Sequence, residues 1–370
     1  MGLVNNIMSN KSMTIGIAGA GVMGRVLAWQ LLRAGFTVSL FDKDDIDFGD
    51  AAAYTAAGML TPYCEVESAE LMVYELGRRS LKLWDNLASE LNGDLGYFKD
   101  GSLVVAHNAD QPDYDQFNQQ VMHKLSPSSD QYQELNQDGL AEVEPELSTQ
   151  FSSAIYLPEE AWLSPTKTLR LLADRLIEGG VTWYSGRVIL STKPHVISTN
   201  EGEHHFDIVI DCRGLGAKSQ WPEIRGVRGE LIWLKAPEVK IKHLVRLMHP
   251  RYRLYLVPCG YDDLYIVGAT QIESSDMGPM TVRSSLELLS AAYSLHSGFA
   301  EARIVDMRTN CRPALEDNLP KIESSDGLIR VNGLFRHGFL LSPALGEEVV
   351  HHLENSNYQS AFAELINRVA

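Results

Sequence analysis

The stretch from Thr14 to Asp42, TIGIAGAGVMGRVLAWQLLRAGFTVSLFD, decides the fold class of this chain. It reads as a strand, a glycine-rich turn, an amphipathic helix and a second strand that ends in a carboxylate. Gly19 permits the tight turn, Gly21 lets a pyrophosphate approach the backbone, and Gly24 lets the helix pack against the sheet. Because unpaired N–H groups at a helix N-terminus favour phosphate, we expect a bound dinucleotide.

Asp42 completes this unit at the tip of the predicted strand Phe36–Phe41. A carboxylate there can accept both hydroxyl protons of an adenosine ribose and would repel a 2′-phosphate. A glycine-rich turn in an ordinary α/β unit is the alternative interpretation. The strand, the helix and the terminal acid all agree with the dinucleotide fingerprint instead.

Length and composition favour a soluble protein of two domains. The 370 residues exceed what one hydrophobic core usually spans. A 45% apolar content and a mean hydropathy of −0.13 are typical of a globular protein, and no apolar run is long enough to span a membrane. The net charge of −16 argues against nucleic acid and anionic membranes as partners, because no cluster of lysine and arginine offsets it.

The residue types that bind metals are scattered along the chain. The cysteines are Cys64, Cys212, Cys259 and Cys311. Their spacing matches neither a zinc site nor a disulfide framework, so we expect no metal and a cytoplasmic location. The pairs His204–His205 and His351–His352 are expected to be solvated, since adjacent side chains point in different directions. Residues 1–12 lack the pattern of a secretory signal and are expected to form a flexible tail.

The chain departs from an ordinary NAD-binding unit after its second strand. Such a unit would continue into a crossover helix and a third strand. Small residues between Ala51 and Gly58 instead leave a nearly bare backbone, suited to lie against a large flat ligand. An alanine-rich helix start is the alternative, and it does not explain the string AAGML that ends close to Pro62.

Hydrophobic spacing and turn residues predict the remaining elements. We expect a helix over Ser68–Leu91, a hairpin over Tyr97–His107 around Gly101, a helix that Ser164 caps, strands at Val181–Tyr184 and Phe206–Asp211, and a final helix that Ser342 caps and Pro343 starts. From these elements we expect a dinucleotide-binding domain over 13–90, 150–222 and 302–370, and an antiparallel-sheet domain inserted over 91–149 and 223–301.

Six motifs together resemble the flavin-dependent D-amino acid oxidase superfamily, and within it the glycine oxidases of the thiazole-biosynthesis type. They are GAGVMG with Asp42, TAAGML at 55–60, VRGE at 227–230, YLVP at 255–258 with VGAT at 267–270, RP at 312–313 with Asp317 and Pro320, and FRHGFLLSPALGE at 335–347. The resemblance runs in the same order over nearly the whole chain. It implies an α/β fold in which a Rossmann-like FAD-binding domain is interleaved with an antiparallel-sheet α+β substrate domain, as in glutathione-reductase-like proteins.

The resemblance also implies a chemistry. FAD would be bound non-covalently, without a tether to Cys311, and a small amino acid would be oxidised to its imine. Reoxidation by O2 would give H2O2, while the imine gives a keto acid and ammonia or enters thiazole synthesis. A D-amino acid dehydrogenase, a sarcosine or secondary-amine oxidase and an NAD-linked dehydrogenase stay open as alternatives, and so does a homo-oligomer.

Three residues take catalytic roles by this resemblance. Arg312 is the expected anchor of the substrate carboxylate, because a planar guanidinium can bind both oxygens. Tyr255 would reach the same carboxylate, and Arg336 would line the site near the flavin. A salt-bridged arginine and a core tyrosine are the alternatives for Arg312 and Tyr255. The cofactor-binding residues expected from the fingerprint and the resemblance are Gly19, Gly21, Val22, Met23, Gly24, Asp42, Ala57, Gly58, Met59, Gly214, Arg312, Gly338, Phe339, Leu340 and Leu341.

Overall fold

The two strands of the Thr14–Asp42 stretch lie in a seven-stranded sheet. The structure is a computed structural model, and it describes residues 13–67, 69–249, 254–355, 357–362 and 364–368. The expected tail at residues 1–12 lies outside the described residues. The strand order is β21-β19-β20-β12-β1-β2-β8, and the five strands from β20 to β8 run parallel. The strands are β1 Thr14–Ala18, β2 Thr37–Phe41, β8 Thr182–Tyr184, β12 Ile208–Asp211, β19 Lys321–Ser325, β20 Leu328–Asn332 and β21 Ile366–Arg368.

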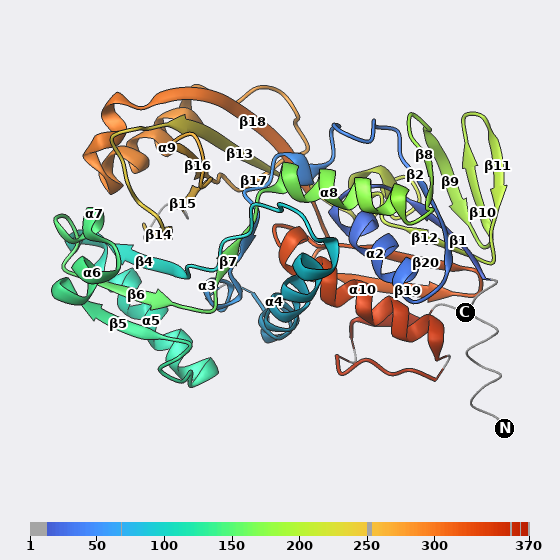
Figure 1. Ribbon diagram of the computed structural model, residues 1–370, viewed down its shortest axis with the longest axis horizontal. Coiled ribbons are helices and arrows are strands. Elements are labelled where there is room, and N and C mark those ends of the chain that lie inside the picture. The colour runs from blue at the N-terminus through green and yellow to red at the C-terminus, as the bar shows by residue number, and fades with distance from the viewer. Residues whose placement is uncertain (1–12, 68, 250–253, 356, 363, 369–370) are drawn as a thin grey trace.

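Long helices cover this sheet (Figure 1). They are α2 Val22–Arg33, α4 Leu71–Leu91, α8 Pro165–Glu178 and α10 Gly338–Glu354. Helix α10 contacts both α2 and α4, and α2 contacts α8. Their apolar faces share one buried core with the sheet, because helix residues spaced three or four apart lie on the same face.

A larger sheet occupies the other side of the molecule (Figure 1). Its order is β17-β13-β16-β15-β14-β4-β6-β5, with β18 beside β13, and all its pairs are antiparallel except β14 with β4. The strands are β4 Ser102–Ala106, β5 Gln133–Asn136, β6 Ser153–Leu157, β13 Arg225–Lys235, β14 Leu244–Met248, β15 Leu254–Pro258, β16 Leu264–Gly268, β17 Ile272–Glu273 and β18 Arg303–Ala314. The two sheets confirm the expected α/β fold with an antiparallel-sheet partner. The residue boundaries of the two domains stay a prediction.

Shorter elements complete the described fold. The helices are α3 Pro62–Glu65, α5 Gln111–Leu125, α6 Gln137–Val143, α7 Pro145–Ser148 and α9 Val282–Leu295, with 3-10 turns η2 Ala52–Tyr54, η3 Asn108–Asp110, η4 Gly214–Ala217 and η5 Ser297–Glu301. The small sheets are β3 Met59–Leu60 with β7 Ala161–Trp162, and β9 Ile189–Lys193, β10 Val196–Thr199 and β11 Gly202–His205. No helix among the described residues is long and apolar enough to cross a membrane.

The final helix begins earlier than expected, at Gly338 and not at Pro343. A proline inside a helix lacks the N–H that would bond to the carbonyl four residues before it, which here belongs to Phe339. The indole Nε1 of Trp84 donates to that carbonyl oxygen at 2.9 Å. Ser342 is therefore not the cap, and its hydroxyl donates to the carbonyl of Gly338. Helix α10 continues through the proline because helix α4 supplies the missing donor.

The expected hairpin over Tyr97–His107 is also wrong. Only β4 is a strand, and it pairs with β14 and β6 rather than with residues before Gly101. Gly101 has a φ of +80°, so it turns the chain as expected, but the partners of β4 come from distant segments. The expected helix over Ser68–Leu91 begins at Leu71, and Ser68 lies outside the described residues.

Candidate active site

A cavity of about 1410 Å³ is lined by residues from both large sheets. Its wall includes the glycine turn after β1, the small-residue segment before β3, parts of β13, β15, β16 and β18, and the start of α10. Of the predicted site residues, all but Gly24 and Leu341 line it. The structure therefore brings segments together that are more than 300 residues apart in sequence.

The glycine turn has the shape that a dinucleotide requires. Gly19 has a φ of +101°, and a Cβ there would lie 2.8 Å from the main chain of Cys212. A Cβ on Gly24 would lie 1.9 Å from the carbonyl oxygen of Gly19, so Gly24 serves the close helix packing and not the cavity wall. A Cβ on Gly21 would meet only Ala51, at 3.8 Å, which leaves the backbone there open to a ligand.

Asp42 lies at the cavity wall directly after β2. Its Oδ2 accepts a hydrogen bond from the N–H of Ala20, and its Oδ1 accepts one from the N–H of Asp44 at 2.9 Å. Desolvation by the surrounding protein raises the pKa of Asp42 above its ordinary value, against the effect of these two donors. The turn thus holds the carboxylate in place at the position where a ribose would be bound.

The small-residue segment reaches the cavity through Ala57, Gly58 and Met59. Gly58 has a φ of +74°, and a Cβ there would lie 1.9 Å from the carbonyl oxygen of Leu163. The N–H of Leu163 in turn donates to the carbonyl of Gly58 at 2.9 Å. Any side chain at position 58 would separate these two segments, so the glycine is required by close packing.

The first turn of α10 lies at the cavity wall, and its first N–H groups have no acceptor within the helix. The first intrahelical bond runs from the N–H of Leu341 to the carbonyl of His337 at 2.8 Å, so the N–H groups of Gly338, Phe339 and Leu340 precede it. These three residues line the cavity, whereas Leu341 is fully buried in the core. Together with Gly214, which has a φ of +55°, they complete a surface that fits FAD: open backbone, a carboxylate at the tip of β2 and two helix N-termini.

Arg312 on β18 has a guanidinium that no carboxylate of the described residues neutralises. Its Nη1 donates to the carbonyl oxygens of Thr270 at 3.0 Å and Arg228 at 3.4 Å. Among the residues that the structure describes, no carboxylate lies within 4.0 Å of its nitrogens. Desolvation and repulsion from Arg336 lower the pKa of Arg312 to about 10. A cation enclosed at a cavity wall in this way suits an anionic ligand.

Gly229 makes room for that guanidinium. The residue lies on β13, and a Cβ there would lie 2.3 Å from Nη2 of Arg312. Val227 of the same strand is paired with Arg312 in the β13–β18 register. The side chain of Arg312 therefore runs along β13 to the one position in VRGE that lacks a side chain.

Arg336 differs from Arg312 because it has a carboxylate partner. Its Nη2 pairs with Oε2 of Glu65, which comes from α3. Nδ1 of His337 lies 3.8 Å from the same oxygen. Burial alone would raise the pKa of Glu65, but the charges of Arg336 and His337 hold it at about 2. Arg213 and Arg308 also line the cavity, and they pair with Asp211 and Asp306. Among the described arginines of the cavity wall, Arg312 is therefore the one whose charge is left for a ligand.

Tyr255 on β15 completes the predicted catalytic set at the cavity wall. Its hydroxyl is buried and has no hydrogen-bond partner in the described part of the chain. Burial raises the pKa of this hydroxyl to about 12, so it is a neutral donor. A buried hydroxyl without a partner is costly, and a bound ligand would remove that cost.

Sequence reasoning missed Glu65, Gly229 and Thr270. Glu65 had no signal beyond its position five residues after AAGML, because its partner Arg336 lies 271 residues further along the chain. Gly229 and Thr270 lie in the motifs VRGE and VGAT, which were used for the resemblance but were not assigned a role. Among the described residues, no group of three or more His, Cys, Asp or Glu side chains could hold a metal ion.

Comparisons with known proteins agree with this geometry. The family model of FAD dependent oxidoreductases (DAO) matches residues 14–352. The putative thiamine biosynthesis oxidoreductase ThiO of Rhizobium etli is 38% identical over 341 residues, covering 92% of this chain and 96% of that protein. The glycine oxidase of Geobacillus kaustophilus is 26% identical over 354 residues, covering 90% of each chain. The crystal structure of that glycine oxidase superposes with a TM-score of 0.82 at 24% identity, over 97% of this chain and 100% of the other.

Proposed function

This chain belongs to the family of FAD dependent oxidoreductases, and from that premise we propose that it oxidises the amine of glycine or a similarly small amino acid to the imine. FAD is its cofactor, so the alternative of an NAD-linked dehydrogenase is set aside. The named activity of one relative, glycine oxidase, supports the proposal, as does the thiamine-biosynthesis name of another. Reoxidation by O2, with H2O2, keto acid and ammonia as products, is part of the proposal.

The observation that carries this proposal is the charge of Arg312, which has no carboxylate partner in the part of the chain that the structure describes. A small amino acid brings one carboxylate, and the cavity wall offers one guanidinium without a carboxylate partner among the described residues. Both oxygens of the carboxylate can bind to one guanidinium, which fixes the orientation of the substrate Cα. The hydroxyl of Tyr255 can donate to the same carboxylate and so gain the partner that it lacks.

The residues of this chain supply orientation and exclusion of water. Bound FAD supplies the acceptor for the hydride that leaves the substrate Cα. Leu231, Val257 and Ile266 add apolar wall to the same cavity, which strengthens the ion pair at Arg312 by lowering the local dielectric. Holding the Cα in one geometry can account for a large part of the rate acceleration without a strong general base.

Non-covalent binding of FAD is also proposed. Cys311 adjoins the anchor in sequence and is buried, with its Sγ donating to the carbonyls of Ser274 at 3.6 Å and Asp276 at 3.5 Å. Burial raises the pKa of this thiol, which disfavours the thiolate that a covalent link would need. All four cysteines are free, and on that ground we propose a reducing, cytoplasmic compartment.

The test uses the purified holoenzyme under anaerobic conditions. Addition of glycine should bleach its visible absorbance, and readmission of air should restore the colour and release H2O2. Bleaching only by sarcosine or D-alanine would favour the secondary-amine oxidase or D-amino acid alternatives, and recovery of colour without H2O2 would favour a dehydrogenase.

Arg312→Ala should lower kcat/KM by about 100-fold or more, since a bidentate ion pair is lost. Arg303→Ala, an exposed residue on the same strand, is the control. Equal rates in the two variants would overturn the proposal.

A further inference from the structure

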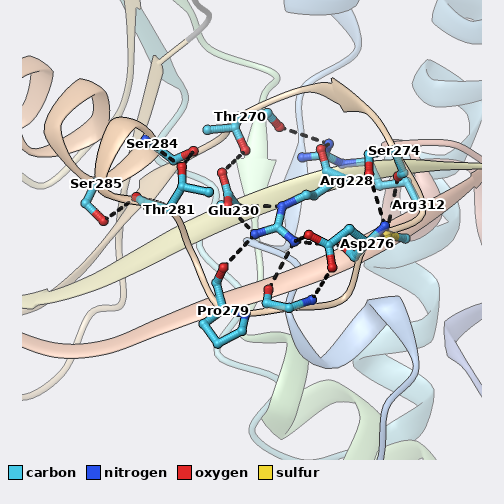
Figure 2. Close-up of polar contacts among 12 residues, drawn as sticks. Arg228, Glu230, Thr270, Ser274, Asp276, Pro279, Thr281, Ser284, Ser285 and Arg312 are labelled. Carbon is cyan, nitrogen blue, oxygen red and sulfur yellow. Dashed lines mark hydrogen bonds and ion pairs between the residues drawn. The ribbon is translucent and has the colours of Figure 1, made fainter.

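Glu230 on β13 is a buried carboxylate that does not line the cavity. Both of its oxygens are used (Figure 2). Oε1 accepts from Nε of Arg228 at 3.1 Å and from its Nη2 at 2.6 Å. Oε2 accepts from the hydroxyl of Thr270 at 2.9 Å. One carboxylate therefore bonds to the side chains of Arg228, on β13, and of Thr270, which follows β16.

The same two residues hold the guanidinium of Arg312. Their main-chain carbonyl oxygens, that of Thr270 at 3.0 Å and that of Arg228 at 3.4 Å, are the acceptors for Nη1 of Arg312. Figure 2 shows the bonds of Glu230 to Thr270 and Arg228, and the bond from Arg312 to Thr270. The guanidinium thus donates to two carbonyls, and both residues that carry these carbonyls bond to Glu230 through their side chains.

Arg228 itself is not available to a ligand. Its side chain is buried, and besides Glu230 its nitrogens donate to the carbonyls of Asp276 at 2.8 Å, Gly278 at 3.0 Å and Pro279 at 2.9 Å. Its charge is balanced by Glu230 and by the carboxylate of Asp276 at 3.1 Å. The carboxylate of Glu230 therefore forms its ion pair with Arg228 and not with Arg312.

We propose that Glu230 is a positioning residue for the substrate carboxylate, acting through Thr270 and Arg228 on the guanidinium of Arg312. This inference rests on the proposed function, because it assumes that Arg312 binds a carboxylate. A misplaced anchor would weaken carboxylate binding and leave the FAD-binding surface intact, since Glu230 does not line the cavity. A displacement of about 1 Å in a group that positions the substrate can lower the reaction rate by up to about 100-fold.

The experiment measures binding of acetate, a carboxylate without a reactive amine, to the holoenzyme by calorimetry. Glu230→Gln should raise the Kd of acetate by roughly 10- to 100-fold while the visible spectrum of bound FAD is retained. Glu144→Gln is the matched control: Glu144 is equally buried and accepts from the N–H groups of Lys242 at 2.8 Å and His243 at 3.1 Å. In an Arg312→Ala background Glu230→Gln should cause no further loss. An unchanged Kd, or the same loss in both backgrounds, would overturn the proposal.

A second pair of variants covers the case in which Glu230→Gln does not fold. Thr270→Val removes the hydroxyl that bonds to Glu230 and keeps the carbonyl that bonds to Arg312. It should weaken acetate binding, and Thr270→Ser should restore it, because serine retains the donor. Equal Kd values for the valine and serine variants would contradict positioning.

Failure of the inference and failure of the proposed function give different results. If wild-type enzyme is bleached by glycine but the variants of Glu230 and Thr270 bind acetate like wild type, only the positioning role is wrong. If wild-type enzyme neither binds acetate nor is bleached by any small amino acid, the proposed function is wrong and the positioning role falls with it.

Discussion

Glu65 forms an ion pair with Arg336 across 271 residues of sequence, at the edge of the cavity. Both side chains are largely enclosed, with 6% and 15% of their surfaces exposed. This pair removes the charge of Arg336 from the site and leaves that of Arg312. It also makes the stability of the fold depend on the ionisation of Glu65.

Replacing Glu65 with glutamine should destabilise the protein by about 3–5 kcal/mol, because it leaves a buried guanidinium without its partner. Urea denaturation with saturating FAD measures the change. Glu287→Gln is the control, since it removes an exposed ion pair with Arg283 that should contribute less than about 1 kcal/mol. A Glu65→Gln variant as stable as this control would contradict the assignment.

The pH dependence of this pair has a definite sign. The pKa of Glu65 is about 2 in the folded protein, below the ordinary value of roughly 4.3 in an unfolded chain. Its stabilising contribution is therefore complete above about pH 4.3 and is lost as the pH falls towards 2. Between these values the stability of Glu65→Gln should fall less steeply with decreasing pH than that of the wild type.

Glu160 should have the opposite pH dependence. It is fully buried, and burial raises its pKa to about 7 although the N–H of Cys64 at 2.9 Å and the hydroxyl of Ser102 donate to it. Between about pH 4.3 and 7 the folded state keeps a proton that the unfolded chain has lost, so stability falls as the pH rises. Glu160→Gln should remove this dependence. The free energy of unfolding of the variant, relative to that of wild type, should therefore be higher at pH 8 than at pH 5. Urea denaturation at pH 5 and pH 8 measures this free energy. If it changes equally with pH in the two proteins, Glu160 does not keep a proton in the folded state.

Trp84→Phe should destabilise the protein by about 1–3 kcal/mol, because the carbonyl of Phe339 would lose the indole donor. In a Pro343→Ala background the same change should cost less, since the N–H of the new alanine can bond to that carbonyl. A double-mutant cycle on the free energy of unfolding measures the coupling. Strictly additive effects would show that the indole does not replace the missing helix bond.

Tyr255→Phe should separate stability from activity. Removing a buried hydroxyl that lacks a partner in the described structure should leave the free energy of unfolding unchanged or higher, whereas KM for glycine should rise by about tenfold or more. Tyr265→Phe is the matched control, because its buried hydroxyl donates to the carbonyls of Val239 at 2.8 Å and Ile241 at 3.3 Å. That control should lose stability and keep its KM. The same pattern in both variants would remove the role of Tyr255 at the substrate.

Local features of the site were predictable and long-range partners were not. The turn at Gly19 and the acid at Asp42 could be assigned because the dinucleotide fingerprint lies within one stretch of 29 residues. The start of α10 was misplaced because a proline in the first turn looks the same in sequence as a proline inside the helix. The indole of Trp84, which lies 255 residues before Phe339, supplies the donor that the proline lacks, and no local pattern encodes that contact. The partners of β4 and of Glu65 are set by tertiary packing, which no local pattern encodes.

The seven-stranded sheet also determines when this protein can fold during synthesis. Strand β1 is translated well before its neighbours, because β12 pairs Ile15 with Ile208 and β20 pairs with β12 only from Leu328 onward. Closing such long loops is slow, and the nascent chain must shield an incomplete sheet from aggregation until most of it has been translated. The yield of folded enzyme on expression should therefore depend more on chaperone supply and translation speed than on the local stability of the Thr14–Asp42 unit.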